Sequence, residues 1–151
     1  MRAQRRGTVG EREWRDVLHR RLATRQEGVV GRDQIVTLGF DRGAIARRLK
    51  TGALIQRHRG VYAVGHEAIS FRGQAIAALL AVGDDAALSH ETVAHLRALL
   101  PTQPPRIDVT IPGRRPRSRE GVRVHAGEVE TARHDGLLMT TPQRVIAETD
   151  G

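Results

Sequence analysis

The 151-residue sequence contains no cysteine, and only 3% of its residues are aromatic. The lack of cysteine excludes disulfide bonds, thiolate zinc sites and a cysteine nucleophile. So few aromatic side chains argue against a binding mode in which single-stranded bases stack on the protein. No apolar run reaches the length of a membrane span, and the N-terminal segment MRAQRRGTVGEREW lacks the apolar core of a signal peptide. We therefore expect a cytoplasmic protein that does not associate with membranes.

Positive charge is abundant and unevenly distributed. The formal net charge is +8, but Met1–Gly60 alone holds 15 Lys and Arg against 6 Asp and Glu, a net charge of +9. Because cations that neutralise phosphates release counterions, a polyanion is the natural partner of this segment. Every cation except Lys50 is arginine, which suits bidentate contacts to phosphate and guanine, although a GC-rich genome would favour the same composition.

The most informative stretch is GVVGRDQIVTLGFDRGAIARRLKTGALIQRHRGVYAVG, residues 28–65. It predicts a first helix at residues 32–38 and a second at residues 42–51. Gly39 stands where a left-handed C-cap favours glycine, and Asp41 stands where a side chain caps the next helix. The pattern is that of a helix-turn-helix.

A short two-stranded ribbon is expected to follow these helices. One strand begins at Leu54, residues 57–60 (Arg-His-Arg-Gly) form a basic turn, and residues 61–64 return. A helix-turn-helix followed by such a ribbon is the plan of a winged helix, in which the second helix enters the major groove and the wing meets the backbone or the minor groove. Solvated arginines on a small helical subdomain are the plainer alternative.

The periodicity of the second helix separates its apolar and basic residues. Ile45 and Leu49 are four apart and share a buried face, whereas Arg47 and Lys50 point the opposite way and Arg48 lies on the flank. We expect Arg47 and Lys50 to contact bases or phosphates, and the cations of the turn to hold the DNA backbone.

The remaining elements are predicted from apolar periodicity, capping residues and turn residues. Residues 1–10 are a basic tail, and Trp14, Leu18 and Leu22 mark the core face of a helix over 11–26. Ser70 caps a helix over 71–82, and Ser89 caps another over 90–100 whose inward residues are Val93, Leu96, Leu99 and Leu100. The expected strands are 86–88, 106–111, 122–125 and 136–140, and a last helix covers 143–149. Strands 106–111 and 122–125 are half-buried by their alternation and form a hairpin around a basic loop.

These elements predict an α+β protein with an N-terminal winged helix-turn-helix followed by a small mixed α/β unit. The expected divisions are a basic tail at 1–10, the DNA-binding domain at 11–66 and a second, truncated-looking domain at 67–151.

Little in the sequence indicates catalysis or metal binding. Ser89 and His90 are adjacent, so their side chains diverge rather than form a nucleophile and base. His90 and His95 are five residues apart with no accompanying carboxylate motif, and His125 and His134 look isolated. We therefore predict no enzyme activity, no metal and no cofactor. The basic loop containing Arg114, Arg115, Arg117 and Arg119 is either solvated or a second contact for DNA or an acidic protein.

The run LATRQEGVVGRDQIVTLGFDRGAIARRLKTGALIQRHRGVYAVG resembles the N-terminal domain of AbiEi-type antitoxins, from type IV toxin–antitoxin (abortive-infection) systems. The likeness continues through ALSHETVAHLRALL, IDVTIP, GVRVHAG and DGLLMTTPQRVIAE, and spans Arg20 to Glu148. It implies a winged-helix repressor of its own operon, joined to a domain that counters a nucleotidyltransferase toxin. The positions that match the recognition helix and wing are Arg42, Arg47, Arg48, Lys50, Arg57, His58 and Arg59.

Three hypotheses remain open at this point. The first is an antitoxin-like autorepressor that binds double-stranded DNA. The second is a protein-interaction module that neutralises a nucleotidyltransferase-type toxin. The third is a remnant of a nuclease-associated protein, although no spaced Asp and Glu-X-Lys set is present to supply a metal-dependent nuclease site.

Overall fold

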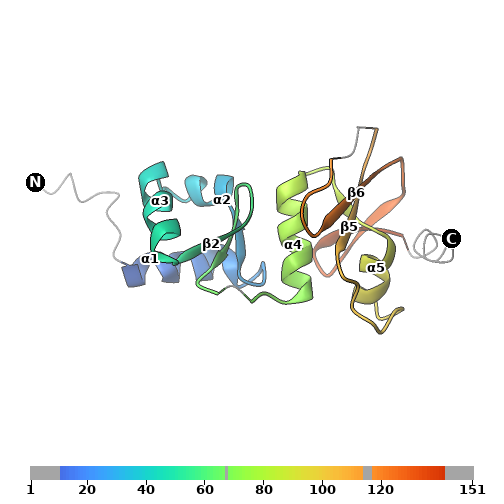
Figure 1. The fold of residues 1–151 in the computed structure, drawn as a ribbon, viewed down its shortest axis with the longest axis horizontal. Helices are drawn as coiled ribbons and strands as arrows, with labels where there is room; N and C mark the ends of the chain where they lie inside the picture. The colour runs from blue at the N-terminus through green and yellow to red at the C-terminus, as the bar shows by residue number, and fades with distance from the viewer. Residues whose placement is uncertain (1–10, 67, 114–116, 142–151) are drawn as a thin grey trace, which may run out of the picture. The chain divides into compact units, whose positions relative to one another are not determined.

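The computed structural model describes residues 11–66, 68–113 and 117–141 (Figure 1). The predicted tail at 1–10 and the predicted helix at 143–149 lie outside these residues. The fold is α+β, as the sequence predicted. The chain divides into two units, Met1–Gly73 and Gln74–Gly151. Within the described ranges, no helix is long and apolar enough to cross a bilayer.

The first unit contains the predicted helix-turn-helix and ribbon, together with one strand that the sequence did not reveal. Its elements are α1 (Glu11–Leu18), a π-helical turn η2 (His19–Ala23), β1 (Val29–Gly31), α2 (Arg32–Thr37), α3 (Arg42–Thr51), β2 (Leu54–His58) and β3 (Val61–Val64). The helix expected over 11–26 thus leaves α-helical geometry after Leu18. The unpredicted β1 is only three residues long and pairs antiparallel with β3, which gives a three-stranded sheet in the order β1-β3-β2.

Local capping fixes the two helices of the helix-turn-helix. Gly39 has a φ of 105° in the turn, and the carboxylate of Asp41 accepts a 2.8 Å hydrogen bond from the backbone N–H of Ala44. Gly52 ends α3 with a φ of 87°. The predictions for Gly39 and Asp41 are confirmed, and so is the predicted end of the second helix at residue 51. At the start of α2, Gly31 has no capping side chain, and its N–H donates instead to Oε1 of Gln34 at 2.8 Å.

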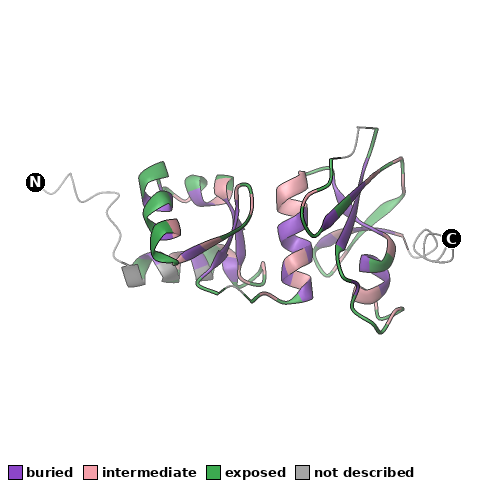
Figure 2. Cartoon of the chain, in the orientation of Figure 1, coloured by how far each residue is buried: buried purple, intermediate pink, exposed green. Residues whose placement is uncertain are grey.

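An apolar cluster lies in the core of the first unit, and Figure 2 shows buried residues on its helices and strands. Trp14 and Leu18 of α1 are fully buried, as their spacing predicted. Trp14 meets the ring of Phe40 edge to face, with the ring centroids 5.7 Å apart. Ile35 from α2 and Ile45 from α3 complete the centre of this core, so both helices are anchored by their inner faces.

The second unit is built on a five-stranded sheet. Its elements are α4 (Phe71–Val82), which begins in the first unit, β4 (Ala87–Leu88), α5 (His90–Leu96), β5 (Ile107–Ile111), β6 (Val122–Ala126), β7 (Thr131–His134) and β8 (Leu137–Thr140). The strand order is β6-β5-β4-β8-β7. In Figure 1, α4 and α5 lie on opposite sides of β5 and β6. As predicted, Ser70 caps α4, because its Oγ accepts the N–H of Gly73 at 3.0 Å.

The predicted hairpin between residues 106–111 and 122–125 is wrong. β5 and β6 pair in parallel, from Ile107 opposite Val122 to Ile111 opposite Ala126. All five residues of β5 are buried, rather than alternate ones, because β5 is an inner strand of the sheet. A strand pattern in the sequence does not specify the partner or the direction of pairing, and this accounts for the error.

Two further features of the second unit differ from expectation. The helix after Ser89 ends at Leu96, and Ala98 adopts a left-handed φ of 63°, so Leu99 is 54% exposed rather than inward. The unpredicted strand β7 forms an antiparallel hairpin with β8. The turn between them is Asp135-Gly136, and both residues have positive φ, as a tight hairpin turn requires.

Candidate nucleic-acid interface

The exposed face of α3 carries three of its four cations. At 100° per residue, the arc that contains Arg42, Arg47 and Lys50 lies opposite the arc that contains Ala44 and Ile45. The first three residues are exposed, whereas Ala44 and Ile45 are buried. The structure therefore places Arg47 and Lys50 as their spacing predicted, on the helix face that the core does not use, and Arg42 lies on the same face.

Arg48 corrects one part of the prediction. It follows Ala44 by four residues and Ile45 by three, so it belongs to the inner arc and is only 6% exposed. Its guanidinium lies over the ring of Trp14, 4.4 Å from the centroid, and Nη1 donates to the carbonyl oxygen of Ala44 at 3.0 Å. Arg48 is thus part of the packing that holds α3 to α1 and is not on the exposed face of the helix.

The wing presents a second group of cations at the tip of the β2–β3 ribbon. Arg57 and Arg59 are exposed, and His58 is half-buried. In the strand register Gln56 pairs with Tyr62 and His58 pairs with Val61, so Arg57 is the extra residue of a β-bulge. A bulge bends the strand and redirects the side chain that it carries. The alternation of residues in the sequence did not predict this bulge at Arg57.

Arg32 ties the wing to the helix-turn-helix, a role that sequence reasoning missed. Its backbone N–H donates to the carbonyl oxygen of Gly60 at 2.7 Å, and its Nη1 donates to the hydroxyl of Tyr62 at 3.2 Å. β1 adds a strand ladder between the residues before α2 and β3. The wing is therefore held to the helix-turn-helix by two sets of hydrogen bonds, those of Arg32 and those between β1 and β3.

The basic loop of the second unit is only partly described. Arg114 and Arg115 lie outside the described residues, Arg117 is exposed, and Arg119 is half-buried with Nη1 donating to the Arg117 carbonyl at 3.2 Å. Arg119 lines a pocket of about 380 Å³ together with Arg106 and Arg123.

The histidines are arranged differently from expectation. His125 is not isolated, since its Nε2 lies 2.9 Å from Oδ1 of Asp108 and its ring stacks on that of His90. Sequence reasoning missed this grouping because the three residues belong to three separate elements. His95 and His134 lie elsewhere: Nδ1 of His95 is 2.9 Å from the carbonyl oxygen of Leu100, and His134 lies beside its neighbour Asp135.

The order of elements in the first unit, with an exposed basic second helix beside a basic ribbon, defines a winged helix-turn-helix. Within this unit, residues 20–65 match the family model described as a transcriptional regulator, the AbiEi antitoxin. The match confirms the resemblance to the N-terminal domain of AbiEi-type antitoxins over that segment. A search of curated proteins gave no match.

Proposed function

We propose that this protein is a DNA-binding transcriptional regulator of the AbiEi antitoxin type and that it represses the operon that encodes it. One observation carries the proposal. The segment that matches the regulator family, residues 20–65, is the segment that exposes Arg42, Arg47 and Lys50 on α3 and Arg57 and Arg59 on the wing. The family supports the regulatory role, and the placement of the cations supports DNA as the ligand.

In the proposed complex, α3 enters the major groove of double-stranded DNA and the wing contacts the adjacent backbone. Arg47 and Lys50 contact base edges or phosphates, and Arg42 at the first turn contacts phosphate. Arg57 and Arg59 bind phosphates through their guanidinium groups. Arg48 has no contact with DNA in this arrangement, because its guanidinium packs on Trp14. A repressor of this kind acts on the chromosome, so the proposal places the protein in the cytoplasm.

A gel-shift titration tests this proposal most directly. The full chain is titrated against the DNA upstream of its own gene, with a scrambled duplex as competitor, at two salt concentrations. We expect preferential binding to the upstream DNA, with an affinity that falls steeply as salt rises. The double variant Arg47→Ala, Lys50→Ala should bind at least ten-fold more weakly, since each base contact contributes about 1–3 kcal/mol of discrimination.

The control for that variant is the single substitution Arg133→Ala. Arg133 is an exposed cation on β7 in the second unit, so its removal lowers the net charge without touching α3 or the wing. Equal affinity of the wild-type protein for the upstream and scrambled duplexes would contradict sequence-specific repression. An equal loss of binding in the control variant would mean that the net charge of the protein, rather than contacts made by α3, accounts for the loss of affinity.

The second part of the proposal concerns a protein partner. The resemblance to AbiEi-type antitoxins extends into segments of the second unit, including ALSHETVAHLRALL and GVRVHAG. On that basis we propose that the protein also opposes a nucleotidyltransferase-type toxin encoded beside it. Co-expression with the neighbouring gene should relieve the growth arrest that the neighbour causes alone. If a variant that lacks the second unit and keeps only DNA binding also relieves the growth arrest, the relief comes from repression rather than from contact with the toxin.

A further inference from the structure

Three side chains of metal-ligand type meet in the second unit, away from the proposed DNA interface. They are His90 at the start of α5, Asp108 on β5 and His125 on β6. Each offers one ligand atom, and these atoms all lie within 4.8 Å of one another. Asp108 is buried, and the two histidines are half-buried. The proposed function gives no role to these three residues.

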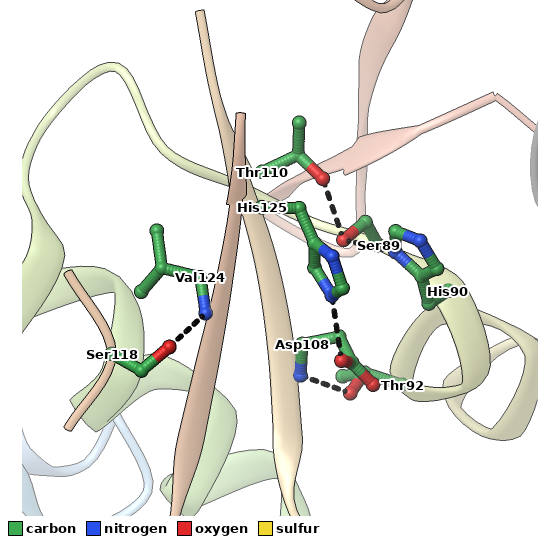
Figure 3. A network of polar contacts seen from close by, with 8 residues as sticks. All are labelled: Ser89, His90, Thr92, Asp108, Thr110, Ser118, Val124 and His125. Carbon is green, nitrogen blue, oxygen red and sulfur yellow. Dashed lines mark hydrogen bonds and ion pairs between the residues drawn. The ribbon is translucent and has the colours of Figure 1, made fainter. Parts of the chain in front are cut away.

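Strand register brings two of the three together. In the parallel β5–β6 pair, His125 lies opposite Thr110, and Asp108 precedes Thr110 by two residues. Side chains two apart in a strand share a face, so Asp108 and His125 project from the same side of the sheet. Nε2 of His125 consequently lies 2.9 Å from Oδ1 of Asp108 (Figure 3).

The beginning of α5 supplies the third residue and is fastened to β5 beside it. The N–H of Ser89 donates to the carbonyl oxygen of Asp108 at 3.0 Å, and the N–H of Asp108 donates to Oγ1 of Thr92 at 2.8 Å. His90 itself has a left-handed φ of 54°. Its ring lies against that of His125, with the centroids 3.9 Å apart and an angle of 20° between the rings (Figure 3).

A second layer of polar groups surrounds the three residues. Nδ1 of His90 is 2.9 Å from Oγ of Ser89, which also accepts a 2.8 Å hydrogen bond from Thr110. Ser89 and Thr110 are both buried. In metal sites the imidazole nitrogen that does not bind the ion characteristically donates to such an acceptor, which orients the ring. Oγ of Ser89 is placed to accept such a hydrogen bond from Nδ1 of His90. Nε2 of His90 is then the atom that would bind the ion.

We propose that His90, Asp108 and His125 bind one divalent transition-metal ion of the zinc class. Two imidazoles and one carboxylate form a nitrogen and oxygen donor set that suits Zn²⁺, whereas Mg²⁺ and Ca²⁺ prefer oxygen ligands alone. The ion takes the place of the proton between His125 and Asp108, and the two stacked rings tilt so that their nitrogens converge on it. Three protein ligands leave the fourth position to water, and the 27% exposure of the His125 side chain gives an ion access from solvent.

Bound metal would join the start of α5 to β5 and β6 through three coordinate bonds. We therefore expect metal binding to stabilise the second unit. An uncoordinated Asp–His hydrogen bond with a stacked neighbour is the alternative that the experiment must separate from the proposal.

The test uses the full chain without an affinity tag. Zn²⁺ is titrated in competition with a chromophoric chelator, and Co²⁺ is added separately to record its visible absorption bands. We expect one equivalent of metal per chain. Asp108→Asn and His125→Ala should each weaken binding by about 100-fold or more, because loss of a second-shell partner already costs 10–100-fold. The matched control is His134→Ala, since His134 also lies beside an aspartate, with Nε2 3.5 Å from Oδ2 of Asp135. It should bind as the wild type does.

A measurement on the wild-type protein keeps the proposal testable if the variants fail to fold. Addition of Zn²⁺ should shift the NMR signals of the His90 and His125 rings and leave those of His95 and His134 in place. Three results would overturn the proposal: no binding by the wild-type chain, undiminished binding by both Asp108→Asn and His125→Ala, or ring shifts confined to other histidines.

Discussion

Two adjacent arginines of α3 have opposite roles in the structure, and replacing them separately tests this. Arg47 is exposed on the proposed DNA face, whereas Arg48 is 6% exposed and lies over Trp14. We expect Arg48→Ala to reduce stability with DNA affinity retained in the folded protein, and Arg47→Ala to reduce DNA affinity with stability retained. The third variant, Arg48→Met, removes the charge but keeps most of the side-chain volume.

The magnitude for Arg48→Ala follows from the contacts it removes. A desolvated cation–π contact contributes about 2 kcal/mol, and a hydrogen bond from a charged group contributes about 1.5–3 kcal/mol before relaxation. We expect a loss of about 2–4 kcal/mol in the free energy of unfolding. At about 4–8 °C per kcal/mol for a domain of this size, Tm falls by about 8–30 °C. Arg48→Met should cost less than about 1.5 kcal/mol, since volume-conserving exchanges are tolerated and no buried charge remains.

The assay is urea or thermal unfolding followed by tryptophan fluorescence. The chain has a single tryptophan, Trp14, and it lies in the core of the first unit, so the signal reports on that unit. Arg47→Ala should change stability by no more than about 0.5 kcal/mol, as is usual for an exposed side chain. DNA affinity is measured by gel shift well below the lowest midpoint, so that every variant is folded.

One outcome would refute this account of α3. If Arg48→Met unfolds like the wild type yet binds the upstream DNA ten-fold more weakly, Arg48 contacts DNA and the buried position over Trp14 is not the one used in the complex. A loss of stability in Arg47→Ala as large as that in Arg48→Ala would equally contradict the division of the helix into an inner and an outer face.

Three further variants, the last with a control, test the wing and the helix ends. Replacing both Arg57 and Arg59 with Ala should lower the slope of log K against log salt by about 2, since each phosphate contact contributes about 0.9; an unchanged slope in a gel-shift series would remove the wing from the interface. Asp41→Ala should lower the free energy of unfolding in urea by about 1 kcal/mol, because the N–H of Ala44 loses its capping carboxylate. An unchanged free energy of unfolding would mean that water replaces the cap without cost. Gly52→Ala should cost about 1–2 kcal/mol because φ is 87°, whereas Gly43→Ala, inside the helix, should not destabilise.

The first unit was largely predictable because its signals are local. Gly39 and Asp41 mark the turn between two helices, and glycines also mark the end of α3 and the tip of the ribbon. Each such residue acts within four positions of itself, so one sequence is enough to find it. β1 was missed because three residues cannot show a period, and its existence depends on β3, thirty or more positions away.

The second unit was harder to predict because its organisation is non-local. The alternation in residues 122–125 correctly indicated a strand, but β6 joins β5 in parallel rather than as a hairpin. The same limit applied to the candidate sites. The spacing of Arg48 from Ala44 and Ile45 is that of an inner residue, but a charged side chain is expected in a core only where it has a partner, and here the partner, Trp14, belongs to another helix. His90, Asp108 and His125 were separated in the sequence and meet only through the register of the sheet and the start of α5.

The two-residue strand β4 has a consequence for how the five-stranded sheet holds together. Ala87 and Leu88 are its whole length, yet they connect β5 on one side, opposite Thr110 and Val109, with β8 on the other, opposite Met139. Few ladder hydrogen bonds therefore cross the middle of the sheet, whereas four or five residue pairs join each outer pair of strands. The backbone ladder is consequently shortest at the centre of the sheet, and we expect local opening there to release the β5–β6 and β7–β8 pairs as separate cooperative groups rather than peel strands from either edge.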